Sequence, residues 1–209
     1  MTADSNEVDC EQRLYVQLLS YLKSWEYLGS RTYAAGTRRI GHIPHVAPEG
    51  YLHQIFPPLD ADGVRQLKAS LDVGLPHSFE RFLHRHNGIN IFGYLSIYGL
   101  RTSYKRDDID VMMEQPFDIV SSNTDEFPIG VPEGYLIVGS FGDGCIPVSL
   151  NPEGEVFLVD VENNVLEKNS ATNIFEFLLD ETMNAAKLFD QKGRRLDRSD
   201  LLHGRTTRV

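Results

Sequence analysis

The sequence predicts an α+β protein in which helices flank an antiparallel sheet. Segments with helical periodicity occur near both ends of the chain and again between residues 60 and 88. Short apolar runs with strand character lie among them, joined by brief turns rich in Gly and Pro. For elements in this order, one antiparallel layer with helices packed against it is the economical architecture.

The N-terminal segment is predicted to be an amphipathic helix over residues 10–28, with Gly29 as its stop. Its apolar residues recur at spacings of four, four and three: Leu14, Leu18, Leu22 and Trp25. We expect this stripe to pack on the main domain or on a second copy of the chain, so a homodimer through the N-terminal extension is possible. Residues 30–50 are rich in Gly, Pro, Thr and Arg, which predicts a loop.

Two further helices are predicted between residues 60 and 88. Asp60 is suited to cap a helix over residues 61–71. Pro76 is suited to the first turn of the next, which buries Phe79 and Phe82 and ends near Asn87-Gly88. A short helix at 117–122 and a final one from Ile174 follow.

Strands are predicted at 51–56, 94–98, 136–139, 146–150 and 155–160. A Pro-Glu-Gly triplet precedes three of the strand-like runs, at 48–50, 132–134 and 152–154. Pro and Gly at these positions suit a type I turn, so the triplets are interpreted as repeated turn chemistry and not as a domain repeat.

The net charge of −10 is concentrated in one segment. Residues 107–167 contain 14 acids and no Lys or Arg, whereas residues 1–106 contain 12 bases and 10 acids, and residues 168–209 contain 8 bases and 6 acids. A solvated acidic face is one interpretation, and a surface that meets a basic partner is the other. The charge argues against a nucleic-acid ligand, because phosphates would be repelled.

The chain has neither a secretory signal pattern nor a run of 18 apolar residues, and its two cysteines lie 135 positions apart. We therefore expect no membrane segment and a reducing, cytoplasmic location.

Several sequence patterns resemble metal-binding or catalytic motifs, but each has a better structural explanation. His84 and His86 are two residues apart on a predicted helix and do not share a face, and no cysteine cluster accompanies the other histidines. The glycine-rich stretch 139–145 lacks the Lys-Ser/Thr of a phosphate loop, and its acidic surroundings disfavour a Cys145 thiolate. The sequence therefore predicts no catalytic residue, no metal and no cofactor.

The order of the motifs resembles the SUKH superfamily. LPHSFERFLHRHNG at 75–88 and YLSIYGL at 94–100 are similar to its Leu-Pro, aromatic helix, Asn-Gly and strand signature. YLIVGSFGDGCIPVSLNPEGEVFLVD at 135–160 and IFEFLL at 174–179 are similar to the later strands and closing helix. The resemblance implies a mixed, largely antiparallel sheet backed by helices, with no shared catalytic residues. It also implies an immunity protein, often directed against a nuclease toxin, or alternatively an interaction scaffold or regulator.

The sequence is therefore interpreted as an N-terminal helix and loop extension (1–58), a SUKH-like domain (59–190) and a basic, flexible tail (191–209). The expected partner is a cognate protein toxin with a basic surface. The candidate partner-binding residues are the densest acids and those that follow them: Asp107, Asp108, Asp110, Glu114, Asp118, Asp125 and Glu126.

Overall fold

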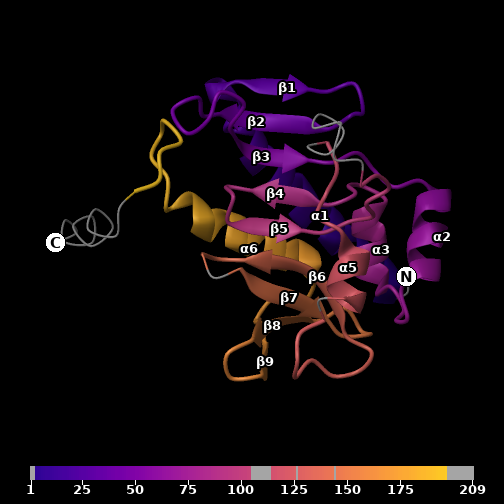
Figure 1. Cartoon of the computed structure of the whole chain (residues 1–209). Helices are drawn as coiled ribbons and strands as arrows, with labels where there is room; N and C mark the ends of the chain where they lie inside the picture. Colours follow the sequence, from indigo (N-terminus) through magenta and orange to yellow (C-terminus); the bar gives the residue numbers. More distant parts are fainter. Residues whose placement is uncertain (1–2, 105–113, 126, 144, 197–209) are drawn as a thin grey trace.

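The computed structural model describes residues 3–104, 114–125, 127–143 and 145–196, and the strands of this part form one nine-stranded sheet (Figure 1). The strand order in the sheet is the order in the chain, and each neighbouring pair is antiparallel. The strands are β1 (Ser30–Thr32), β2 (Arg38–His42), β3 (Tyr51–Ile55), β4 (Ile89–Ile91), β5 (Leu95–Ile97), β6 (Leu136–Phe141), β7 (Ile146–Leu150), β8 (Val156–Asp160) and β9 (Val165–Lys168). The predicted α+β class with a largely antiparallel sheet is confirmed.

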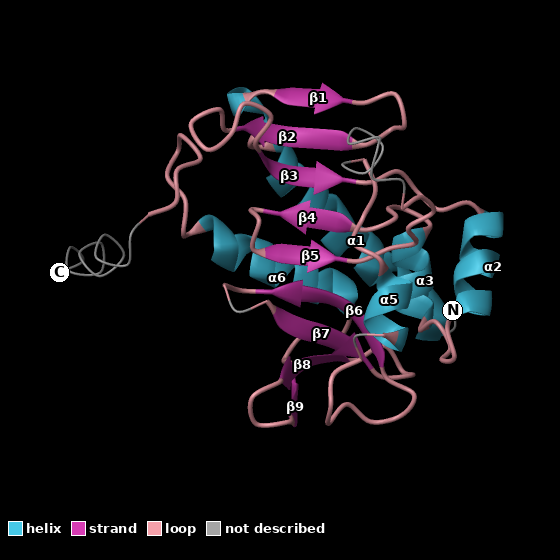
Figure 2. Ribbon diagram, in the orientation of Figure 1, coloured by secondary structure: helices cyan, strands magenta, loops and turns pink. Residues whose placement is uncertain are grey.

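The helices lie before, between and after the strands. They are α1 (Ala3–Lys23), the 3-10 turn η1 (Glu26–Leu28), α2 (Ala61–Ser70), α3 (His77–Leu83), α5 (Ile119–Thr124) and α6 (Ile174–Ala186). Figure 2 shows α1 and α6 behind the sheet, where they cover one of its faces. The ring of Phe177 on α6 meets that of Phe141 on β6 edge-on, with centroids 5.9 Å apart. The covered face of the sheet and these helices therefore share one hydrophobic core.

Strand register separates an apolar face from a polar one. Directly paired residues point to the same side of a sheet. One paired row on the helix-covered side is buried: Ile55, Ile89, Ile97, Gly139 and Val148. The row beside it points to the opposite side and is polar: Arg31, Arg39, Gln54, Asn90, Ser96 and Ser140.

The N-terminal helix packs on its own chain, as predicted. Leu18 and Leu22 are buried, Leu14 is partly buried against the core, and Trp25 is 9% exposed. The predicted helix over 10–28 is shorter at its C-terminal end. The α-helix ends at Lys23, and Trp25 directly precedes the 3-10 turn at Glu26–Leu28.

Residues 30–50 do not form the predicted loop, because β1 and β2 make a hairpin that extends the sheet beyond β3. Their composition pointed to a loop because only one side of β2 is apolar and β1 is exposed throughout. The hairpin forms through backbone hydrogen bonds between β1, β2 and β3, which the side-chain pattern does not reveal. β4 and β9, which are three and four residues long, were also not predicted: β9 is largely exposed, and β4 is too short for its two buried residues, Ile89 and Ile91, to form a recognisable pattern.

Most other predicted elements are present, with shifted ends. Asp60 caps α2 by accepting a hydrogen bond from the Gly63 amide at 2.7 Å. The second helix ends at Leu83, four residues before the predicted Asn87-Gly88. The amide of Asn87 instead clamps the backbone of Leu100, donating to its carbonyl at 2.8 Å and accepting from its N–H at 2.7 Å.

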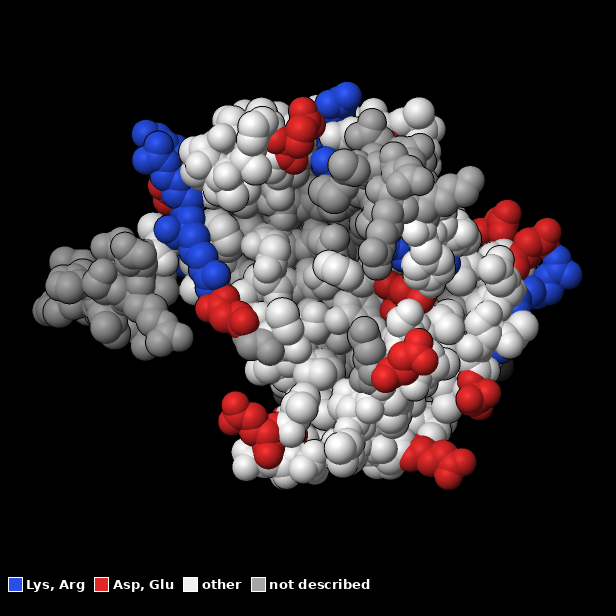
Figure 3. Space-filling view, viewed as in Figure 1, with Lys and Arg blue, Asp and Glu red and all other residues white. Residues whose placement is uncertain are grey.

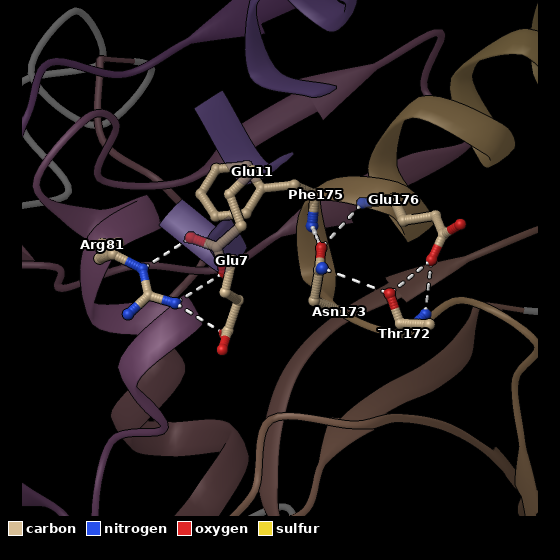
Figure 4. A network of polar contacts seen from close by, with 7 residues as sticks. All are labelled: Glu7, Glu11, Arg81, Thr172, Asn173, Phe175 and Glu176. Carbon is tan, nitrogen blue, oxygen red and sulfur yellow. Dashed lines mark hydrogen bonds and ion pairs between the residues drawn. The ribbon is translucent and has the colours of Figure 1, made fainter. Parts of the chain in front are cut away.

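The last helix begins at a reciprocal cap, visible in Figure 4. The side-chain oxygen of Asn173 accepts hydrogen bonds from the amides of Phe175 and Glu176. Glu176 in turn accepts from the amide and hydroxyl of Thr172, both at 2.7 Å. The bonds to Asn173 satisfy amides that a helix start leaves without partners, and the bonds from Thr172 fix the residue before the cap, which explains why α6 begins at Ile174.

Candidate functional site

The predicted acidic site falls only partly within the described structure. Asp107, Asp108, Asp110 and Glu126 lie outside the described residues. Glu114 lies beside the β1–β2 hairpin, where its backbone carbonyl accepts a hydrogen bond from the Thr37 hydroxyl at 3.0 Å.

Asp118 has a structural task within the chain. It caps α5, accepting from the amides of Val120 and Ser121, and it also accepts from the hydroxyls of Tyr104 at 2.5 Å and Ser121 at 2.7 Å. Burial acts to raise the pKa of Asp118, but these hydrogen bonds outweigh it, so the pKa lies below its ordinary value. A carboxylate engaged in this way has little capacity left for a partner.

Residues 107–167, the segment without Lys or Arg, contain three other acids that bind partners within the chain. Asp143 forms an ion pair with Arg195 at 2.6 Å, which joins the β6–β7 turn to the residues after α6. Glu155, directly before β8, pairs with Lys168 at the end of β9, also at 2.6 Å. Asp160 accepts hydrogen bonds from the amide and side chain of Asn163 in the β8–β9 turn.

A different pair of carboxylates lines a groove. Two adjoining cavities, of about 390 and 310 Å³, share Asp72, Val73, Glu133 and Gly134 as lining residues. Residues 72–76, from the loop between α2 and α3, form one wall, and residues 133–135 with Pro152 form the other. Phe127 and Val131 extend the lining of the smaller cavity. We call this feature the acidic groove.

The two carboxylates that line the acidic groove are exposed to solvent and can interact with a partner. Asp72 and Glu133 are exposed, and neither makes an ion pair within the described chain. No Lys or Arg is among the described residues that line either cavity. Figure 3 agrees, because acidic side chains but no basic ones are visible over α5 and the lower strands. Asp125, from the predicted set, is likewise exposed at the end of α5.

Close backbone contacts hold the loops around the acidic groove in place. Gly130 has φ +91°, and a Cβ there would lie 2.8 Å from the carbonyl oxygen of Asn164 in the β8–β9 turn. Gly154, after Pro152, has φ +86°, and a Cβ would lie 2.7 Å from the Ser78 hydroxyl at the start of α3. The glycines of this region are therefore required by a left-handed backbone and by tight packing together.

The features that resembled catalytic chemistry lie apart from one another in the fold: the glycine-rich stretch runs from the end of β6 into the β6–β7 turn, and the two histidines are at the end of α3. Gly142 and Asp143 lie in a turn, and Cys145 is exposed with φ +50°. His84 is exposed, whereas His86 shares a hydrogen bond of 2.8 Å with the Tyr15 hydroxyl. Across the described ranges, no three potential metal ligands gather at one place.

Comparison with known families identifies the domain. The SMI1 / KNR4 family (SUKH-1) model matches residues 58–180, more than half of the chain. The chain belongs to the SMI1/KNR4 (SUKH-1) family. No curated protein matches its sequence.

The SUKH-1 match begins just before α2 and ends within α6, so it includes both walls of the acidic groove. It excludes α1 and β1–β3, although these elements belong to the same sheet and core. None of the helices in the described part of this SUKH-1 protein is long and apolar enough to cross a membrane.

Sequence reasoning missed the acidic groove because its parts are far apart in the chain. Asp72 lies outside the base-free segment, and Glu133 was interpreted only as part of a turn triplet. A signal was nevertheless present in residues 127–132, Phe-Pro-Ile-Gly-Val-Pro, where apolar residues alternate with turn formers next to acids. Large apolar side chains in such a stretch are candidates for a binding surface.

Proposed function

We propose that this SUKH-1 protein is a cytoplasmic immunity protein that binds and neutralises a cognate toxin, with a nuclease as the favoured toxin class. The proposal is carried by the acidity of residues 107–167, which include 14 acids and no base. A nuclease site that holds phosphates is basic, so an acidic inhibitor can occupy it by matching the charge of the substrate. Family membership is compatible with this function.

The proposed mechanism is occlusion of the toxin and requires no catalysis. Complementary charge raises association rates to about 10⁸–10⁹ M⁻¹s⁻¹ from roughly 10⁵–10⁶ for uncharged surfaces. Fast capture is useful when a single free toxin molecule is damaging. The unengaged carboxylates of the described chain, among them Asp72, Asp125 and Glu133, support this use of the surface.

The alternative is a reversible interaction scaffold or regulator, which family membership also allows. A direct test expresses the protein encoded by the gene immediately upstream in bacterial cells, with and without this chain. Immunity predicts that the neighbour arrests growth and that co-expression of the chain restores it. Arrest that persists despite full expression of the chain contradicts immunity against that neighbour. Specific capture of a non-toxic cellular protein would then favour the scaffold.

A second experiment tests whether the predicted acids take part. The substitutions Asp107→Lys, Asp108→Lys, Asp110→Lys and Glu114→Lys are combined, and association with the toxin is measured at 50 and 300 mM salt. Clustered charges act together within a Debye length of about 8 Å at physiological salt, so their reversal is expected to slow association and weaken its salt dependence. An unchanged rate would remove this group from the recognition surface.

A further inference from the structure

The acidic groove combines unpaired carboxylates with exposed apolar side chains. Ile129 is 80% exposed and Phe127 is 36% exposed, and they belong to the loop that continues into the groove at Val131 and Glu133. On the opposite wall, Val73 and Leu75 are half-buried. An apolar centre with charges at its edge is the usual composition of a protein-binding surface.

Contacts with the sheet and its β8–β9 turn hold the loop that forms one wall of the groove. Gly130 packs against Asn164, and the ring of Tyr135 meets that of Phe157 on β8 edge-on, with centroids 5.2 Å apart. Both contacts fix the 127–135 loop to the sheet. A preformed surface loses little conformational entropy on binding, which favours affinity.

The two carboxylates determine what can bind. A purely apolar segment that covered Asp72 and Glu133 would remove their water without replacing the lost interactions, which costs free energy. A segment with a Lys or Arg offsets this cost, because its ammonium or guanidinium group can meet the carboxylates. The methylene stem of such a side chain can at the same time lie along Val73 and Leu75.

We propose that the acidic groove binds a segment of the partner in which a Lys or Arg stands next to large apolar residues. If the proposed function holds, this segment belongs to the toxin. The recognition surface then lies between the α2–α3 loop and the 127–135 loop, not on Asp118, whose carboxylate is engaged within the chain.

The ligand chemistry is tested on the full chain with three synthetic hexapeptides, alternating Arg-Leu, Glu-Leu and Arg-Gly. Binding is followed by ¹⁵N NMR. Only the Arg-Leu peptide is expected to give saturable shifts that cluster at Val73, Leu75, Phe127 and Gly134. Equal binding of the Arg-Gly peptide, or shifts centred elsewhere, would overturn the proposal.

A charge-matched pair of variants separates the groove from general acidity. Asp72→Lys with Glu133→Lys changes the net charge by +4, and so does Glu162→Lys with Glu167→Lys, two exposed acids outside the groove lining. We expect the groove variant to weaken peptide binding by about tenfold and the control by less than about threefold. Similar losses in both would show that overall charge, and not the groove, is responsible. Far-UV circular dichroism checks that both remain folded.

The same variants in the toxin growth assay distinguish the two proposals. Loss of protection in the groove variant alone supports the groove as the toxin-binding surface. Protection that survives in both variants overturns this inference and leaves immunity intact. A third outcome is that the unmodified chain gives no protection but the Arg-Leu peptide still binds in the groove. In that case the immunity proposal fails, whereas the proposal that the groove binds a basic and apolar segment is supported.

Discussion

Arg81 and Glu11 form an ion pair that joins α3 to the N-terminal helix, as Figure 4 shows. The Nε atom of Arg81 donates to one carboxylate oxygen at 2.6 Å, and Nη2 donates to the other at 2.7 Å. Glu11 is fully buried, whereas Arg81 is 30% exposed and also reaches Glu7 at 3.1 Å. Glu11 lies outside the SUKH-1 match and Arg81 lies inside it, so this ion pair attaches the N-terminal helix to the matched part of the chain.

Arg81→Ala is expected to lower the free energy of unfolding by about 2 kcal/mol. The change leaves Glu11 buried without its base, and the partial exposure of Arg81 keeps the cost below that of a fully buried pair. Urea denaturation measures it, with Arg65→Ala in the exposed Arg65–Asp62 pair as the control, where we expect less than about 0.5 kcal/mol. If the two substitutions cost the same, the Arg81–Glu11 pair does not fasten α1.

The stability of the protein is expected to fall between pH 6.5 and pH 5 because of His53. This side chain is 1% exposed between the rings of Trp25 and Phe92, and burial lowers its pKa to about 3. The unfolded chain binds a proton at His53 below its ordinary pKa of 6.5, whereas the folded chain does not until about pH 3. The stability lost through His53 therefore approaches about 1.4 kcal/mol for each pH unit toward the lower end of this window and amounts to roughly 1.5–2 kcal/mol over the whole window.

His53→Phe tests this by removing the titrating group while keeping a ring of similar size. The variant is expected to lose about 2 kcal/mol less than the natural protein between pH 6.5 and 5 in urea denaturation. Some slope remains, because burial also lowers the pKa of His86, to about 4. His45→Ala, at an exposed site, is the matched control for removing a histidine. Identical slopes in all three proteins would exclude His53 as the cause.

Asn87→Ala is expected to destabilise the fold by about 2 kcal/mol, because both of its hydrogen bonds to the Leu100 backbone disappear. Gly99→Ala should have a similar effect, since its Cβ would lie 2.3 Å from the Asn87 side-chain oxygen. The two effects should add only in part, because the clash with the Asn87 side-chain oxygen is shared, whereas the added Cβ would still lie 2.5 Å from the carbonyl oxygen of residue 87. Thermal and urea denaturation of the single and double variants measure this. Full additivity would contradict a shared contact.

Leu22→Ala should cost about 3 kcal/mol, because Leu22 is completely buried and the change leaves a cavity. Val16→Ala on the same helix is the matched control, since Val16 is 54% exposed and should cost less than about 0.5 kcal/mol. Both are measured by urea denaturation. A small loss for Leu22→Ala would mean that α1 contributes little to the core.

Patterns with a strong local cause were predictable from the sequence. The stripe of Leu18 and Leu22, the cap at Asp60 and the helix that buries Phe79 and Phe82 all follow from residues within a few positions of one another. The hairpin of β1 and β2 was missed because its pairing depends on β3 and its side chains carry little apolar signal. Short strands acquire their structure from neighbours that periodicity within a single segment does not reveal.

The sequence by itself determined the fold class, the family and the concentration of acids in residues 107–167, because each of these is a property of local pattern or composition. Only the tertiary structure decided which acids are available. It engages Asp118 in a helix cap and Asp143 in an ion pair, and it brings Asp72 and Glu133, which are 61 positions apart in the chain, to one groove. The reason is that a carboxylate's availability depends on the donors that folding places beside it, and these come from distant segments.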